Sequence, residues 1–89
     1  MYILTIYGRE KEGAYAVVNS DGDQILYIFE EEDDAVRFAM MLEEDDYPEM
    51  HVMEVEKEDI ITACEMHDYQ YAIITPNDIV IPPEQNDFI

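Results

Sequence analysis

The stretch AYAVVNSDGDQILYIF, residues 14–29, decides the fold. Two runs rich in β-branched and aromatic residues, 14–18 and 24–29, flank the segment from Asn19 to Asp23, which contains an Asp-Gly pair. Asp-Gly between two such runs is a strong local signal for a β-hairpin, because these residues tolerate the positive φ of hairpin turns. We therefore predict a hairpin, and with it a sheet that the rest of the chain must extend and cover.

Further strands are predicted on both sides of the hairpin. Residues 2–7 carry apolar side chains on both faces, which is typical of a central strand. Residues 50–55 and 69–74 form shorter β-rich runs, and residues 79–81 form a possible edge strand after a turn.

Two helices are predicted between these strands. The first covers about residues 31–45 and ends at Tyr47-Pro48, because proline disfavours helix in the residue before it. Its apolar residues fall in one helical stripe, at Ala35, Phe38, Ala39 and Leu42. The second opens at residues 56–59, with Val55 and Ile60 spaced as a hydrophobic staple. Its stripe comprises Ile60, Ala63, Cys64 and His67.

The order strand, hairpin, helix, strand, helix, strand predicts an α+β protein. Right-handed crossovers would place both helices on one face of a mixed sheet of about four to five strands, a two-layer sandwich of ferredoxin-like character. Eighty-nine residues leave room for one core. We expect a single domain over residues 1–83 and a flexible acidic tail over residues 84–89.

This arrangement would leave one sheet face uncovered. The side chains expected on it are apolar or aromatic, namely Tyr2, Leu4, Tyr27 and Tyr71. An open apolar face on a small domain favours self-association, so these four residues are a candidate dimer face. The alternative is that the tyrosines half-cover a solvated sheet.

The chain is strongly acidic: twenty-three Asp and Glu against four Lys and Arg give a formal net charge of −19. Such a charge repels nucleic acids and anionic membranes, so the partner we expect is a basic protein surface, with no direct contact to nucleic acid or membrane. No apolar run approaches the length of a membrane span. Cys64 is the one cysteine, which excludes an internal disulfide and favours a reducing, cytoplasmic setting.

The acids of the first helix divide into two groups. Those near its start are favoured by the helix dipole, so helix initiation alone could explain them. Those of its last turn meet the negative end of the dipole and gain nothing locally; they either bind something positive or belong to a general surface acidity. The candidate partner-binding residues are Glu31, Glu32, Asp33, Glu43, Glu44, Asp45 and Asp46.

Metal and catalytic sites receive little support. The oxygens of Ser20, Asp21 and Asp23 would suit Ca²⁺ or Mg²⁺, but the EF-hand spacing is absent. Cys64 and His67 lie three residues apart, yet two ligands do not make a zinc site, and a core thiol and a helix-end cation explain them. The chain has no nucleophile elbow and no glycine-rich phosphate loop. We expect no metal, no cofactor and no enzymatic activity.

One resemblance to a known family can be stated. The run from Phe29 to Ala39 with Leu42-Glu43, together with residues 12–15 and Cys64-Glu65 before Tyr69, resembles a small family of cyanobacteria and plant plastids catalogued as domain of unknown function 3110. The resemblance covers roughly residues 2 to 83. It implies a photosynthetic bacterium or its phage as the source, and it brings no catalytic residues with it.

These observations favour a small acidic protein–protein interaction module, a regulator, inhibitor or accessory factor that binds a basic surface and possibly mimics nucleic acid. Carboxylates at both ends of a helix that rises 1.5 Å per residue can approach the charge density of a duplex. Two alternatives remain open: an acidic domain adapted to high salt, and a protein that binds a divalent metal.

Overall fold

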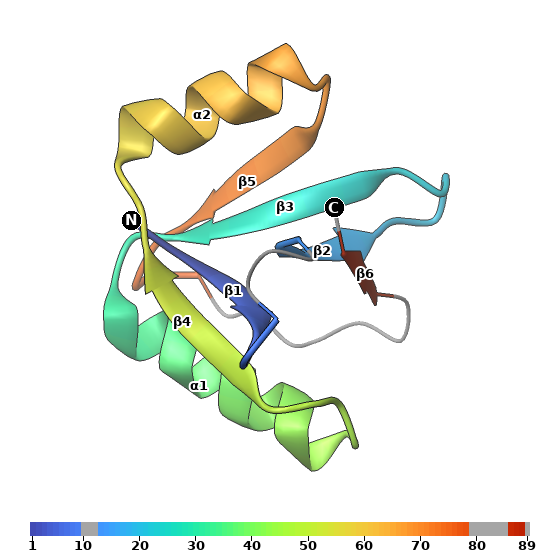
Figure 1. Ribbon diagram of the computed structural model, residues 1–89, viewed down its shortest axis with the longest axis vertical. Helices are drawn as coiled ribbons and strands as arrows, with labels where there is room; N and C mark the ends of the chain where they lie inside the picture. Colours follow the sequence, from blue (N-terminus) through green and yellow to red (C-terminus); the bar gives the residue numbers. More distant parts are fainter. Residues whose placement is uncertain (10–12, 79–85, 89) are drawn as a thin grey trace.

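The computed structural model describes residues 1–9, 13–78 and 86–88, which form one α+β unit (Figure 1). Its helices are α1 (Glu32–Glu44) and α2 (Lys57–Met66). Its strands are β1 (Tyr2–Ile6), β2 (Tyr15–Val18), β3 (Gln24–Phe29), β4 (Met50–Glu54), β5 (Gln70–Ile74) and β6 (Asn86–Phe88). The α+β class and the predicted elements up to residue 74 are confirmed.

The strands form one sheet in the order β4-β1-β3-β2-β6, with antiparallel neighbours, and β5 pairs with β3 in parallel outside this order. The predicted hairpin is present, since β2 and β3 pair from Val18 opposite Gln24 onward. β1 lies between β4 and β3, as expected of a central strand. A ferredoxin-like topology is not confirmed.

The turn of the hairpin is organised by one side chain. Asn19 Oδ1 accepts hydrogen bonds from the N–H groups of Asp21 (3.0 Å) and Asp23 (2.9 Å). Gly22 has a φ of 84°, which glycine adopts without a steric penalty. The side-chain oxygen of Asn19 is thus engaged by two backbone N–H groups, and the segment from Asn19 to Asp23 acts as a turn.

The two helices lie on opposite sides of the strands, so the prediction that both cover one face is wrong (Figure 1). The reason lies in the alternation of side chains along β1. Leu4 packs into the cluster beneath α1, whereas its neighbour Ile3 packs with Cys64 of α2. Consecutive strand residues point to opposite faces, and both faces of β1 are apolar, so each face attracts a helix.

The α1 side holds the larger core. Phe38 of α1 is 1% exposed, and its ring centroid lies 5.5 Å from those of Tyr15 and Phe29 and 5.8 Å from that of Tyr27. Such tilted aromatic pairs each contribute roughly 0.5–1.5 kcal/mol beyond the area they bury. The helical stripe predicted for this segment is confirmed, because the buried residues of α1 are Ala35, Phe38, Ala39 and Leu42.

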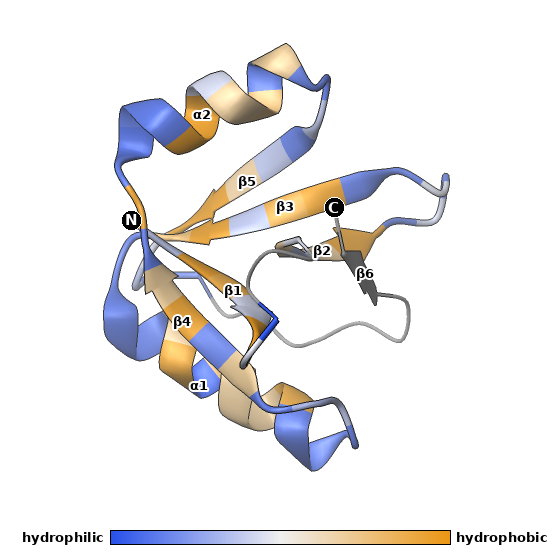
Figure 2. Cartoon of the chain, in the orientation of Figure 1, coloured by the Kyte–Doolittle hydropathy of each residue, from blue (hydrophilic) through white to orange (hydrophobic). Residues whose placement is uncertain are grey.

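The α2 side is packed more thinly. Cys64 is the buried residue of α2, and it joins Ile3, Leu26 and Ile28 in a second cluster. Val55 and Ile60 both pack against this cluster, in agreement with the staple expected at the start of α2. Figure 2 shows the result: the central strands are hydrophobic, while both ends of α1 and the start of α2 are hydrophilic.

Both helices end in the same hydrogen-bonded motif, in which an aspartate takes the left-handed conformation. Asp46 has a φ of 68° and Asp68 a φ of 57°. After α1, the N–H of Tyr47 donates to the carbonyl of Leu42 (3.1 Å) and that of Asp46 to the carbonyl of Glu43 (3.2 Å). The equivalent bonds follow α2, from Tyr69 to Cys64 (2.8 Å) and from Asp68 to Glu65 (3.4 Å). These are Schellman motifs, which usually place glycine where the aspartates lie.

The C-terminal segment differs in part from expectation. A flexible tail was predicted for residues 84–89, but Asn86–Phe88 pair with β2 as β6. The predicted edge strand at residues 79–81 lies outside the described residues. Within the described part of the chain, neither helix has the length and apolar character needed to cross a membrane.

We predict that Asp46→Gly raises the free energy of unfolding by roughly 0.5–1 kcal/mol, because glycine relieves the left-handed strain of an L-residue. The measurement is urea unfolding followed by circular dichroism. Asp46→Asn is the matched control, since it removes the same charge but keeps a side chain. A gain from Asp46→Gly no larger than that from Asp46→Asn would contradict the assignment of strain to this backbone.

Candidate functional site

The predicted acidic residues lie at opposite ends of α1 and are exposed. Glu31, Glu32 and Asp33 surround its start, and Glu43 to Asp46 its end. Thirteen residues at 1.5 Å each separate the two groups by about 20 Å. Since charges farther apart than roughly 8 Å are largely screened at physiological salt, the groups act as two separate sites.

At the start of α1, the structure brings a further carboxylate to the predicted group. Glu54, at the end of β4, lies opposite Tyr2 in the antiparallel register of β1 and β4. The hydroxyl of Tyr2 donates a hydrogen bond to Glu54 Oε2 (3.2 Å). We call Glu31, Glu32 and Glu54 the N-terminal cluster. The prediction missed Glu54, although the register of the two strands would have located it.

The electrostatics of Tyr2 show that these carboxylates converge. Partial burial, then the charge and hydrogen bond of Glu54, and then the charges of Glu32 and Glu31 raise the pKa of the Tyr2 phenol above its ordinary value. Three acids from two elements therefore act on one hydroxyl. Asp33 is exposed on α1 and is not among the groups that raise the pKa of Tyr2.

At the end of α1, four acids follow one another in an exposed turn. We call Glu43, Glu44, Asp45 and Asp46 the C-terminal cluster. The last turn of α1 contains no basic residue, and none of the four forms an ion pair with a described residue. Asp46 has the conformational role described above, whereas Glu43, Glu44 and Asp45 meet the negative end of the helix dipole without compensation.

Between the two clusters, the outward face of α1 exposes two apolar residues and one cation, Arg37, whose side chain is 69% exposed. Val36 is 39% exposed and Met40 59% exposed, and their spacing of four residues places them on one side of the helix. Asp33 and Glu43 continue this side toward the two ends at spacings of three residues. The centre of the outward face of α1 is therefore formed by Val36, Met40 and Arg37, and carboxylates lie at both of its ends.

The candidate dimer face is not an open surface. Leu4 is 1% exposed beneath α1, and Tyr2 and Tyr27 pack against the same cluster. Tyr71 pairs with Leu26, so it lies on the opposite face, toward α2. The prediction of one open face formed by these four residues is wrong, because α1 covers the face that three of them share. Self-association itself stays a prediction.

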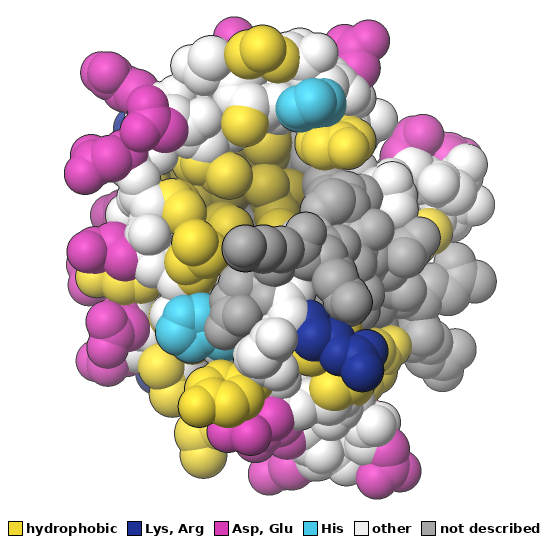
Figure 3. Space-filling view, in the orientation of Figure 1, with side chains coloured by type: hydrophobic (Ala, Val, Ile, Leu, Met, Phe, Trp, Pro, Cys, Tyr) yellow, Lys and Arg dark blue, Asp and Glu magenta, His cyan; other side chains and the backbone are white. Residues whose placement is uncertain are grey.

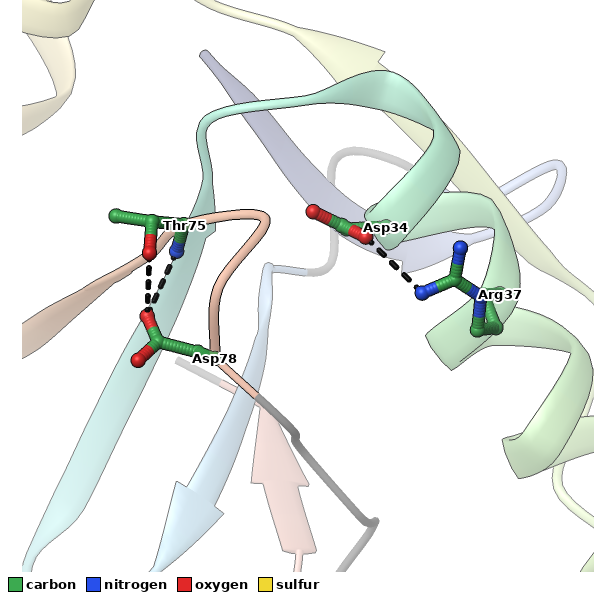
Figure 4. A network of polar contacts seen from close by, with 4 residues as sticks. All are labelled: Asp34, Arg37, Thr75 and Asp78. Carbon is green, nitrogen blue, oxygen red and sulfur yellow. Dashed lines mark hydrogen bonds and ion pairs between the residues drawn. The ribbon is translucent and has the colours of Figure 1, made fainter.

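Asp34 and Arg37 form an ion pair on α1, with Arg37 Nη1 3.1 Å from Asp34 Oδ1 (Figure 4). The side chain of Asp34 is 14% exposed, and its Oδ2 is buried without a hydrogen-bond partner among the described residues. A cavity of about 20 Å³ lies beside it, lined by Phe29, Asp34, Arg37, Phe38, Met41, Ile74 and Asp78. That volume suits one water molecule and is too small for a substrate.

Asp78, on the other side of this cavity, is engaged in its own turn. Its Oδ2 accepts hydrogen bonds from the N–H (2.8 Å) and the Oγ1 hydroxyl (3.0 Å) of Thr75 (Figure 4). Its carboxylate therefore stabilises the turn after β5.

Within the described part of the chain, no three His, Cys, Asp or Glu side chains are arranged to hold a metal ion. Cys64 is buried, as predicted of a core thiol, and burial together with the charge of Glu65 raises the pKa of this thiol. His67 follows α2 at its C-cap, as expected of a helix-end residue, and its ring stacks on Tyr69 with centroids 5.5 Å apart.

In a comparison with protein families, the model of the family described as domain of unknown function DUF3110 matches residues 1–84. The chain belongs to this family. The match spans every described element except β6. No curated protein and no solved structure matches the chain. The family description assigns no activity, so the function of this member has to be argued from its surface.

We predict that Glu54→Gln lowers the pKa of the Tyr2 phenol toward its ordinary value, because it removes the carboxylate whose charge acts most strongly on this hydroxyl. The measurement is an alkaline titration of the assigned Tyr2 ring carbon by NMR. Glu43→Gln, which removes the same charge at the other end of α1, is the matched control and leaves the Tyr2 pKa unchanged. Equal shifts in the two variants would contradict the convergence of Glu54 on Tyr2.

Proposed function

We propose that the protein is a small acidic interaction module, acting as a regulator, inhibitor or accessory factor, which binds a basic protein surface through the outward face of α1. The observation that carries the proposal is the exposed apolar pair Val36 and Met40, with carboxylates at both ends of the face. Arg37 lies beside this pair, and its charge is engaged by Asp34. Stable protein interfaces combine an apolar core with a polar rim, and this face has both.

The charge arrangement supports a basic partner. Glu43, Glu44 and Asp45 are unfavourable for the helix that carries them, and a Lys or Arg of a partner would remove that cost on binding. The N-terminal cluster lies about 20 Å away along α1, so a partner that contacts both clusters presents two basic groups at that spacing. An opposite charge pattern would also accelerate association at low salt.

A cytoplasmic location, a photosynthetic source and self-association belong to the same proposal. Self-association would have to use a surface other than the face beneath α1. A net charge of −19 opposes the approach of two copies, which makes a basic heterologous partner the better-supported occupant of α1.

Neutralising the two ends of α1 should change stability in opposite directions. We predict that Glu43→Gln/Glu44→Gln/Asp45→Asn stabilises the fold, whereas Glu31→Gln/Glu32→Gln/Asp33→Asn destabilises it, because the helix dipole repels the first group and attracts the second. Each charge contributes about 0.3–1 kcal/mol at low salt. The measurement is urea unfolding at low ionic strength. The same sign in both variants would contradict this electrostatic assignment.

Partner capture tests the proposed function. The wild-type protein is immobilised on a resin and incubated with native lysate at low salt. It should retain a basic protein that is released at high salt and can then be identified by mass spectrometry. Glu43→Gln/Glu44→Gln/Asp45→Asn should lose most of this capture despite its greater stability. Met40→Ser should also weaken capture, while Met66→Ser, the same change at a 77% exposed methionine of α2, should not.

Other results would point to the alternative functions. Full capture by the triple variant contradicts the role of the C-terminal cluster. Absence of any partner, with folding only in molar salt, indicates a domain adapted to high salt. A stoichiometric divalent metal in the purified protein indicates a metal-binding function.

A further inference from the structure

β4 is an edge strand of the sheet. It stands at one end of the strand order, and among the described strands it pairs with β1 alone. Two backbone hydrogen bonds beyond its ends show which of its groups face β1. The N–H of Val55 donates to the carbonyl of Met1 (2.8 Å), and the N–H of Tyr7 donates to the carbonyl of Glu49 (2.9 Å). In an antiparallel ladder, residues that bond to the neighbouring strand alternate with residues whose N–H and C=O point away from it.

This alternation fixes the direction of every backbone group along β4. His51 and Met53 are in phase with the two terminal bonds, so their N–H and C=O groups bond to β1. The backbone groups of Met50, Val52 and Glu54 point the other way, and we call these three residues the β4 edge. Within the described part of the chain, the outward groups of the β4 edge have no hydrogen-bond partner. They form a row of donors and acceptors on which a further strand can pair.

The two acidic clusters lie at the two ends of β4. α1 runs beside β4 in the opposite direction (Figure 1), and Leu42 of its last turn packs into the same cluster as Met50, so the C-terminal cluster lies at the start of the strand. At the other end, Tyr2 pairs with both Glu54 and Phe29, and α1 begins three residues after Phe29. The N-terminal cluster therefore lies at the end of β4. Figure 3, in the orientation of Figure 1, shows Asp and Glu side chains around both ends of this strand.

Charge decides which kind of strand fits this edge. Residues 49–56 contain three glutamates and no Lys or Arg. Charged side chains on an edge strand oppose pairing with another copy of the same chain, and a second copy here would bring the same glutamates and a net charge of −19. A strand with a basic residue near each end meets the opposite charge at both clusters. The acids that exclude self-pairing therefore favour a basic strand.

The spacing of the clusters sets the length of that strand. An extended chain rises about 3.4 Å per residue, so two basic residues about six positions apart are separated by about 20 Å. The clusters at the two ends of α1 are separated by the same distance of about 20 Å.

We propose that an extended basic segment of the partner adds to the sheet as a strand along the β4 edge, with Lys or Arg residues about six positions apart at the two acidic clusters. This inference rests on the proposed function, because it specifies how the same basic partner binds. Backbone hydrogen bonds to the β4 edge supply affinity, and the charges at its two ends set register and selectivity. The partner contacts β4 in addition to the outward face of α1.

The test uses a peptide of about seven residues with blocked ends, in which Thr and Val alternate between two terminal Lys residues. One control peptide has Glu in place of both Lys residues. A second control keeps the Lys residues and carries N-methyl groups on its central amides, so it cannot pair as a strand. Each peptide is titrated into the full-length protein at low salt, and backbone amide hydrogen exchange is followed by NMR.

The expected result is a protection pattern that alternates along β4. The Lys peptide should slow exchange at the amides of Met50, Val52 and Glu54 by about tenfold when its concentration is about ten times its Kd. The amides of His51 and Met53 should be unaffected, because they already donate to β1. Neither control peptide should protect the β4 edge.

Three results would overturn the proposal. They are binding of the Lys peptide without protection of the β4 edge, equal protection of all five β4 amides, and protection by the N-methylated peptide. The first result leaves the proposed function standing, since the acidic clusters would still bind a basic partner. Equal binding of the Lys and Glu peptides would contradict the proposed function as well.

A pair of variants tests the outward N–H of Val52 directly. Val52→Pro removes this donor, and proline is compatible with an edge strand where the missing N–H points away from the neighbouring strand. Binding of the Lys peptide should weaken by about tenfold. Val52→Ala, the matched control, also loses side-chain volume but keeps the N–H and should bind as the wild type does. Equal binding by the two variants would contradict the β4 edge, and if Val52→Pro does not fold, the N-methylated peptide decides on the wild-type protein.

Discussion

The contact of Phe38 with three aromatic rings of the sheet is the interaction on which the rest of the structure depends. Tyr15 of β2 and Tyr27 and Phe29 of β3 meet it within 6 Å, so one side chain of α1 holds both strands of the hairpin. The protein has to retain a compact state against a net charge of −19, and the described ion pair of α1 offsets little of it. Aromatic burial is insensitive to this charge, which explains why so acidic a chain can fold.

The hairpin and α1 could be predicted because their signals are local. The Asp-Gly turn and the stripe of Ala35, Phe38, Ala39 and Leu42 each reflect a preference of a few neighbouring residues. The placement of α2 could not be predicted in this way. It depends on Ile3 and Leu4 facing opposite sides of β1, and a pattern that is apolar on both faces does not indicate which face receives which helix. The mistaken dimer face follows directly from this, because Leu4 had to be assigned to the face left open.

In the candidate site, too, the features set by neighbouring residues could be predicted, whereas those set by residues distant in sequence could not. Exposure of the acids at both ends of α1 follows from their position outside the apolar stripe, and it was predictable. The approach of Glu54 to Tyr2 depends on strand register, and the separation of the two clusters depends on the length of α1. A hollow of about 170 Å³ between α2 and the sheet was not predictable, because the small residues Ala63 and Cys64 of α2 leave this space only where they face Ala14, which is distant in sequence.

The two Schellman motifs change the meaning of the acidity at the helix ends. Each motif needs a residue with positive φ after the helix, and the chain places Asp46 and Asp68 there although glycine would do so at lower conformational cost. The negative charges of Asp46 and Asp68 at the helix C-termini are therefore explained by backbone conformation, because aspartate can adopt the positive φ that each motif needs. Glu43, Glu44 and Asp45 have no such role, since they precede the left-handed residue. These three carboxylates are the ones whose presence on α1 the fold itself does not explain, and a basic partner is the explanation that the structure supports best.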